Sequence, residues 1–164
     1  MPQCHCPPKV GDYFYSDGTF STEREASKTC IGIVFYVGQH ENDGSDYSAT
    51  GIGQAKCHGY AVAVQDAASN CIWGASAKKV GLCPTDEEGN MLDNVNNPDI
   101  DWNGYAWMQK IINAAGGKDK LNATEEAGYP ATYYAAVDYQ NKVAAPANTS
   151  GWFLPAIGQM RNID

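Results

Sequence analysis

The chain has 164 residues, the length of one ordinary domain, and its 43% of hydrophobic residues can form a core, which excludes a disordered tail. The formal net charge is -8, so the basic footprint of a nucleic-acid-binding protein is missing. No apolar run reaches the roughly 18 residues that a membrane-spanning helix needs. We therefore expect one globular domain that neither spans a membrane nor binds nucleic acid.

The first half of the chain predicts β-strands. A hairpin is expected around Asp17-Gly18, because aromatic, β-prone residues flank this pair and the pair itself favours a tight turn. The most hydrophobic run, 29–37, and a second run, 58–65, have the length and β-branched content of strands buried on both faces. Residues 71–73 are expected to form a short third strand.

The second half of the chain predicts helices. Apolar residues recur on one helical face from Asp101, a capping residue, to about Ala115. Pro130 suits the first position of a second helix that extends to about Tyr139. Pro155 begins a short third helix. Because the strands precede the helices, the order indicates an α+β fold rather than alternating βαβ units.

The first nine residues are interpreted as a leader or linker, so the domain is expected over residues 10–164. This leader lacks the charged start and apolar core of a signal peptide.

The six cysteines are Cys4, Cys6, Cys30, Cys57, Cys71 and Cys83. An even number suits disulfides in an exported domain, and six cysteines allow 15 pairings. The Cys-His-Cys run is too tight for tetrahedral zinc binding, so disulfides or free structural thiols are expected instead.

Several stretches together resemble a known family. They are Val10–Ser21, Thr29–Val37, His58–Ala67 and Gly151–Met160. They look like a module common in surface proteins of gut Bacteroidetes, related to the C-terminal domain of the Legionella collagen-like adhesin, with a C-type-lectin-like fold. The Gly-Trp-Phe-Leu-Pro turn that ends at Pro155 is the most specific part. In that family further strands follow the next helix, so the resemblance implies a small antiparallel sheet with two or three helices that lacks its last strands.

The resemblance implies a non-catalytic binding or adhesion module, exported to the cell surface or beyond it, whose ligand is a glycan, a matrix component or a protein. A sheet without its last strands has an unpaired edge, so we also expect self-association through that edge. The export signal itself is not present in this chain.

Two other functions use the same fold. One is a variable receptor-binding protein of a phage or a diversity-generating cassette, in which the fold is a scaffold for mutable positions. The other is an enzyme of the formylglycine-generating type, which needs a reactive cysteine pair late in the domain. No cysteine follows Cys83, and no nucleophile motif of the Gly-x-Ser-x-Gly type occurs. The expectation is therefore a protein that is not an enzyme.

The aromatic content, with 10 tyrosines and 4 tryptophans, suggests a binding surface. Exposed aromatic side chains stack on sugar rings and dominate protein interfaces. The residues expected to contact a ligand are Trp107, Tyr133, Tyr134 and Tyr139. Trp152 and Pro155, at a loop-to-helix junction, are assigned structural roles, and Trp73 and Trp102 are expected in the core with Trp152.

Calcium is the cofactor that the carboxylates suggest, because Ca²⁺ takes six to eight oxygen ligands. The candidate ligands are Asp43, Asp46, Asp99 and Asp101. None of these aspartates lies in a sequence that matches an EF-hand loop, and aspartate is also a common turn and cap residue. The expectation is no cofactor, with calcium as the alternative.

Overall fold

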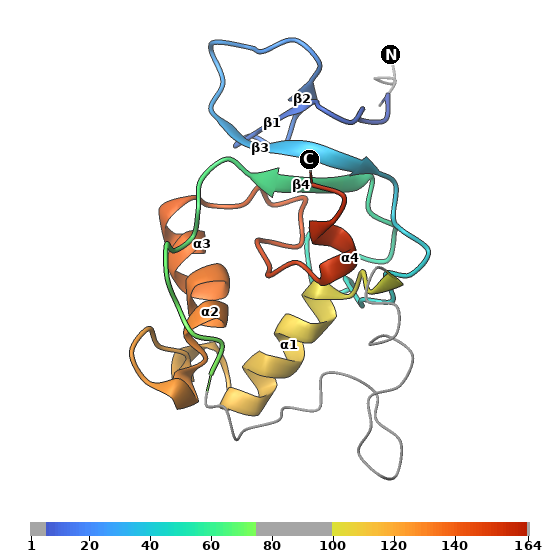
Figure 1. The fold of residues 1–164 in the computed structure, drawn as a ribbon. Coiled ribbons are helices and arrows are strands. Elements are labelled where there is room, and N and C mark those ends of the chain that lie inside the picture. The colour runs from blue at the N-terminus through green and yellow to red at the C-terminus, as the bar shows by residue number, and fades with distance from the viewer. Residues whose placement is uncertain (1–5, 75–99, 164) are drawn as a thin grey trace.

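The computed structural model describes residues 6–74 and 100–163 of the chain. The described part is an α+β fold with a small four-stranded antiparallel sheet, as the sequence predicts. The strands are β1 (Tyr13–Tyr15), β2 (Phe20–Ser21), β3 (Cys30–Val37) and β4 (Gly59–Ala63). The principal helices are α1 (Gly104–Ala115), α2 (Pro130–Tyr133), α3 (Tyr139–Lys142) and α4 (Ile157–Met160). Figure 1 shows these helices on one side of the sheet, the side of β4.

The sheet has the strand order β2-β1-β3-β4, with every neighbouring pair antiparallel. The two predicted hydrophobic strands form β3 and β4, which pair along most of their length. The prediction of a third strand at 71–73 is wrong: these residues are irregular, and the Ile72 carbonyl accepts a hydrogen bond from Ala131 N–H at 3.1 Å. Within the described residues, β4 is therefore an edge strand.

The hairpin between β1 and β2 has a wider turn than the sequence predicts. Phe14 pairs with Phe20, and Gly18 N–H donates to the Tyr15 carbonyl at 2.9 Å. Gly18 has φ +83°, a left-handed conformation that glycine adopts without strain. The Asp17 carboxylate accepts the Thr19 N–H at 3.0 Å, which fixes the turn from inside. The Asp-Gly pair thus makes the hairpin, in a longer loop than a two-residue turn.

The first predicted helix forms α1, but Asp101 does not cap it. The N-cap position is Asn103, whose side chain makes no capping hydrogen bond. Asp101 accepts the Asn103 N–H at 3.0 Å and so orders the turn that precedes the helix. At the other end, Gly116 takes the left-handed C-cap conformation with φ +94°.

The second predicted helix is one continuous segment over residues 130–142 with a change of pitch in its middle. Between α2 and α3 lies a π-helical turn, η4 (Tyr134–Asp138). The remaining short elements are the 3₁₀ turns η2 (Lys118–Lys120) and η3 (Glu126–Gly128). Pro130 occupies the first helical position, as predicted.

The hydrophobic core has two parts. One lies between α1 and the 130–142 helix and comprises Met108, Ile111, Ile112, Leu121, Tyr129, Ala135 and Ala136. The other surrounds Trp102, which is 1% exposed and stacks flat on His40, with 4.0 Å between the ring centroids. The core prediction is confirmed for Trp102 and wrong for Trp73, which is 64% exposed. None of the helices in the described ranges is long and apolar enough to cross a membrane.

Candidate functional site

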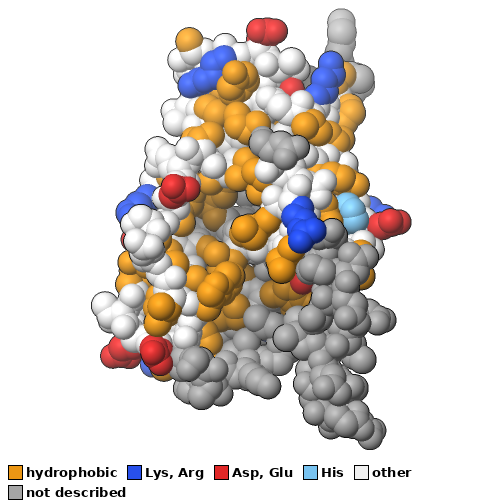
Figure 2. All heavy atoms as spheres, in the orientation of Figure 1, with side chains coloured by type: hydrophobic (Ala, Val, Ile, Leu, Met, Phe, Trp, Pro, Cys, Tyr) orange, Lys and Arg blue, Asp and Glu red, His pale blue; other side chains and the backbone are white. Residues whose placement is uncertain are grey.

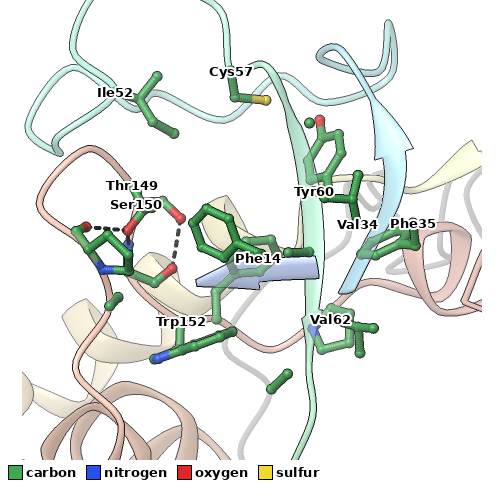
Figure 3. A pocket seen from close by; sticks show the side chains of 18 of the residues that line it. Phe14, Val34, Phe35, Ile52, Cys57, Tyr60, Val62, Thr149, Ser150 and Trp152 are labelled. Carbon is green, nitrogen blue, oxygen red and sulfur yellow. Dashed lines mark hydrogen bonds between the residues drawn. The ribbon is translucent and has the colours of Figure 1, made fainter. Parts of the chain in front are cut away.

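A large apolar cavity lies between the sheet and the C-terminal loop, with a volume of about 580 Å³ (Figure 3). Ligand sites in proteins have volumes of roughly 300–1,000 Å³ and are lined mostly by apolar groups. Figure 2 shows hydrophobic side chains gathered around a recess in the middle of this face. We call this space the sheet cavity. It is the strongest candidate for a binding site in the described residues.

The first wall of the sheet cavity is the sheet itself. Every residue of β4, from Gly59 to Ala63, lines the cavity, although successive side chains of a strand point to opposite faces. The cavity must therefore follow the edge of β4 rather than one face alone. Phe14 of β1 and Phe35 of β3 add aromatic rings to this wall (Figure 3).

The opposite wall is the loop before α4, and Trp152 is its largest side chain (Figure 3). The Trp152 indole N–H donates to the Val143 carbonyl at 2.7 Å, and its ring meets Tyr139 edge-on at 5.3 Å between centroids. Gln140 Nε2 donates to the Trp152 carbonyl at 3.1 Å. The end of the 130–142 helix thus fixes the tryptophan against the cavity. The prediction that Trp152 is buried in the core is corrected: the residue is half-buried and lines the cavity.

Pro155 lies in the same wall, but it does not begin the last helix as predicted: α4 starts at Ile157, and Ala156 is its N-cap residue. The neighbouring loop hydroxyls are already bonded: Thr149 Oγ1 donates to the Pro146 carbonyl, and Ser150 Oγ donates to the Gly151 carbonyl, both at 2.7 Å (Figure 3). These bonds stiffen the loop that carries Trp152. The loop has no regular secondary structure over residues 150–156, and these hydrogen bonds fix its conformation.

Buried polar atoms without partners distinguish the sheet cavity from an ordinary packing gap. Gln159 is 0% exposed, and its Oε1 accepts the N–H groups of Gly104 and Ala156 at 3.2 and 2.8 Å. Its Nε2 has no hydrogen-bond partner in residues 6–74 and 100–163. Gln159 also lines the cavity. A buried amide normally satisfies its donors, so this one is available to an acceptor on a ligand.

Tyr139 supplies a second such group. The residue is 4% exposed and lines the cavity, and its hydroxyl makes no hydrogen bond of ordinary geometry within the described part of the chain. Burial raises the pKa of this hydroxyl, while the nearby Gln65 backbone amide acts in the opposite direction. A neutral phenol can donate one hydrogen bond and accept others. The cavity wall therefore carries a free amide and a phenol whose proton has no acceptor in the described residues.

Charged side chains are scarce in the sheet cavity. Among the described residues that line it, the charged ones are Lys56 and Asp66, both exposed. The rest of the lining is aliphatic, aromatic or uncharged polar. A strongly charged ligand would lose its hydration here without gaining ionic partners. The lining thus favours an apolar ligand that offers hydrogen-bond acceptors.

A cluster of polar side chains supports the end of the cavity near Cys57. Buried Asp43 accepts the hydroxyl protons of Tyr47 and Tyr60 at 2.6 and 2.7 Å, and it also accepts the Ser45 N–H at 3.0 Å. Burial and the hydrogen bond to this carboxylate raise the pKa of both tyrosines. The carboxylate therefore acts as the acceptor that holds Tyr47 and Tyr60 in the cavity wall.

Cys57 is the one thiol that lines the cavity in the described residues. Burial raises the pKa of this thiol; a hydrogen bond with Tyr60 opposes the shift, and the charge of Asp43 adds to it. The thiolate, not the thiol, is the nucleophile, so reactive cysteines have lowered pKa values. The environment of Cys57 instead raises the pKa of its thiol, so it does not favour the thiolate.

Cys57 should therefore react slowly with iodoacetamide. We expect the exposed Cys71 to be alkylated first at pH 8, and Cys57 to reach a comparable rate only at a higher pH, because its thiolate forms later. Mass spectrometry of tryptic peptides after timed alkylation measures both rates in one sample. Equal rates for Cys57 and Cys71 at pH 8 would contradict the prediction.

The structure brings only one of the predicted ligand contacts, Tyr139, to the sheet cavity. Trp107 donates its indole N–H to both carboxylate oxygens of Asp101, at 3.0 and 2.8 Å, and is half-buried. Tyr133 and Tyr134 are half-buried and meet edge-on at 5.5 Å between centroids. The prediction that Trp107, Tyr133 and Tyr134 contact a ligand therefore stays a prediction, because these three residues do not line the sheet cavity.

The carboxylates predicted as calcium ligands have other roles in the described residues. The Asp43 carboxylate is occupied by tyrosine hydroxyls, and Asp101 is occupied by Trp107. Asp46 is exposed and accepts the Ser48 N–H at 2.9 Å in a turn. Asp99 lies outside the described residues. No group of three or more His, Cys, Asp or Glu side chains in residues 6–74 and 100–163 could hold a metal ion.

The cysteines within the described ranges are free thiols, namely Cys6, Cys30, Cys57 and Cys71. Cys4 and Cys83 lie outside those ranges. The expectation of disulfides in an exported domain stays a prediction.

Most residues of the cavity wall, including Phe14, Tyr60 and Gln159, are not predicted from the sequence as ligand contacts. Strand alternation could have indicated one face of β1 and β4, but not that the edge of β4 stays open. The Gly-Trp-Phe-Leu-Pro turn was the useful signal, because a run of large apolar residues in a loop needs a surface to cover.

Comparisons with protein families, with curated proteins and with solved structures found no match for this chain. The candidate site must therefore be interpreted from its own geometry.

Proposed function

We propose that this chain is a non-catalytic binding module of the cell-surface adhesion type, and that its sheet cavity holds an apolar segment of a protein ligand. The observation that carries the proposal is the cavity itself: about 580 Å³ lined by apolar side chains, with an unpartnered amide and an unpartnered phenol in its wall. Shape, apolar lining and a few placed polar groups are what binding sites share.

The C-type-lectin-like fold is part of this proposal. The resemblance implies a small antiparallel sheet with two or three helices, and the four-stranded antiparallel sheet and short helices agree with that. The turn around Trp152, which is the most specific part of the resemblance, forms one wall of the cavity. The residues that carry the resemblance, around Trp152, are thus also residues that line the cavity.

A protein ligand suits the lining better than a glycan does. A sugar offers many hydroxyls, and each needs a partner when it leaves water. Four of the five hydroxyls in the cavity wall already donate hydrogen bonds: those of Thr149 and Ser150 within the loop, and those of Tyr47 and Tyr60 to Asp43. The apolar rings and aliphatic side chains instead match the side chains of a polypeptide, whose backbone supplies acceptors for Gln159 and Tyr139.

The environment of Cys57 supports a binding role rather than covalent catalysis. Burial raises its pKa, and the charge of Asp43 adds to that shift, so the thiol stays protonated at neutral pH. Catalysis would require the reverse, a lowered pKa with a base beside it.

Selection from a displayed library of random dodecapeptides tests the proposed function. We expect enrichment of apolar peptides that bind the wild-type protein, slow the alkylation of Cys57 and leave that of Cys71 unchanged. Trp152→Ala should weaken binding at least tenfold by calorimetry, because it removes the largest side chain of one wall. The matched control is Trp73→Ala, whose side chain is 64% exposed and does not line the cavity, and which should bind as the wild type does.

Two results would overturn the proposal. One is recovery of no peptide that protects Cys57, with binding instead to a glycan array. The other is equal binding by the Trp152→Ala and wild-type proteins when both give the same circular dichroism spectrum.

A further inference from the structure

We propose that the ligand binds as an added β-strand along the open edge of β4, with its backbone paired to Ala61 and Ala63. The partner segment would be extended, apolar in its middle and basic at its flanks. This inference rests on the proposed function, because it places the polypeptide ligand in the sheet cavity, and it adds how the ligand is recognised.

The first step is the position of β4. The sheet order ends with β4, and β3 is its strand neighbour in the described residues. The sheet cavity touches every residue from Gly59 to Ala63, so the open side of the strand faces the cavity. An exposed strand edge is a template for pairing with another chain.

The second step is the direction of the backbone groups. Val64 N–H donates to the Ile31 carbonyl of β3 at 3.3 Å, so the groups of Val64 point toward β3. Alternate residues of an antiparallel strand point their N–H and C=O to the same side. The groups of Ala63 therefore point away from β3, into the cavity.

The backbone N–H and C=O of Ala61 also point away from β3. Its partner in the ladder is Val34, but Val34 N–H donates to Asp12 at 2.9 Å, on the side of β1. Ala61 and Val34 thus form a pair that is not hydrogen-bonded. Two residues of β4 consequently offer a donor and an acceptor each to a new strand.

The third step is a pair of polar groups in the cavity wall, the Gln159 amide and the Tyr139 hydroxyl, the second of which lies beside the Gln65 backbone amide just beyond β4. Gln159 Nε2 and the Tyr139 hydroxyl are buried donors without a partner in the described part of the chain, and both line the cavity. Peptide carbonyls are the acceptors that an added strand brings. The apolar lining takes the alternate side chains of the ligand.

The net charge of the chain favours one kind of partner over another. The chain carries a net charge of -8, so a second copy would meet long-range repulsion, whereas a segment with basic flanks would be attracted. The occupant is therefore a strand of a different polypeptide. Pairing of two β4 edges, the self-association that an unpaired edge suggests, is one outcome of the test.

Backbone methylation of the tightest selected dodecapeptide tests the pairing. Methyl groups on alternate nitrogens block one edge of a strand, and a second set blocks the other edge. Because only one edge of the peptide can face β4, we expect one set to weaken binding at least tenfold and the other to leave it within threefold. In the wild-type protein, hydrogen exchange of the Ala61 and Ala63 amides should slow at least tenfold when the unmethylated peptide binds.

A variant of the protein tests the same backbone pairing from the side of β4. Ala61→Pro removes an N–H that makes no bond to β3, which an edge strand tolerates, and should weaken peptide binding at least tenfold. The matched control is Ala26→Pro, an exposed position outside the cavity and the second residue of the turn that the Lys28 N–H closes on the Glu25 carbonyl, where proline is favoured.

If peptides protect Cys57 but both methylated sets bind equally and the two amides exchange as before, strand pairing is wrong while the proposed function stands. If no peptide protects Cys57, the proposed function itself fails. If sedimentation shows a micromolar dimer that Ala61→Pro abolishes, the occupant is a second copy and the choice of partner is overturned.

Discussion

Replacing Trp102 by alanine is expected to lower the free energy of unfolding by about 4 kcal/mol, within the range for large aromatic residues in cores. Its side chain is 1% exposed, stacks on His40 and packs against Tyr36 at 4.8 Å between centroids. Its removal leaves a cavity at the junction of β3, β4 and the start of α1, which cannot collapse without moving all of them. Urea unfolding followed by circular dichroism measures the change.

The control for this variant is Trp73→Ala, in which the same chemical group is removed from a side chain that is 64% exposed. Its expected effect is below about 0.5 kcal/mol. Equal losses in the two variants would mean that the aromatic cluster around Trp102 does not hold the sheet to the helices.

Removal of the Asp43 carboxylate should have the next largest effect. Asp43→Ala takes away the common acceptor of Tyr47 and Tyr60 and leaves their hydroxyls buried. A hydrogen bond to a charged group contributes about 1.5–3 kcal/mol, so we expect a loss of about 4 kcal/mol in the free energy of unfolding. Because both tyrosines line the sheet cavity, peptide binding should fall as well.

Asp46→Ala is the matched control, because Asp46 is a nearby exposed aspartate whose oxygen accepts one turn N–H. We expect a loss below about 1 kcal/mol. Urea unfolding at pH 7 compares the two variants. A small effect at Asp43 would indicate that the tyrosine hydroxyls find water when the carboxylate is absent.

Sequence patterns predict the elements of this fold better than its surfaces. The strands β3 and β4 and the helices α1 and α2 follow from apolar runs, helical spacing and Pro130, which are local properties. The sheet order is not local. That β4 ends the sheet follows from which strands meet in space, and this decides where the cavity lies.

The site was harder to predict for the same reason. The sequence predicts Tyr139 as an exposed aromatic ligand contact, whereas in our proposal this residue acts through a buried hydroxyl. The sequence predicts Trp107 as a surface residue. In the structure its indole N–H donates to the carboxylate of Asp101, six positions earlier. Gln159 gave no signal at all, because an isolated glutamine in a short helix becomes notable only when its amide is left without a partner.

The π-helical turn η4 sets which residue of the following helix faces the sheet. A π-turn holds one more residue than an α-helical turn, and each residue of a helix advances the direction of the side chain by about 100°. Without that extra residue, position 139 would point roughly a quarter of a turn away from the cavity. A relative of this chain that has lost one residue between 134 and 138 would thus keep the start of the helix at Pro130, yet present a different side chain to the cavity. A single insertion or deletion in this turn is therefore a route by which binding specificity could diverge while the fold is retained.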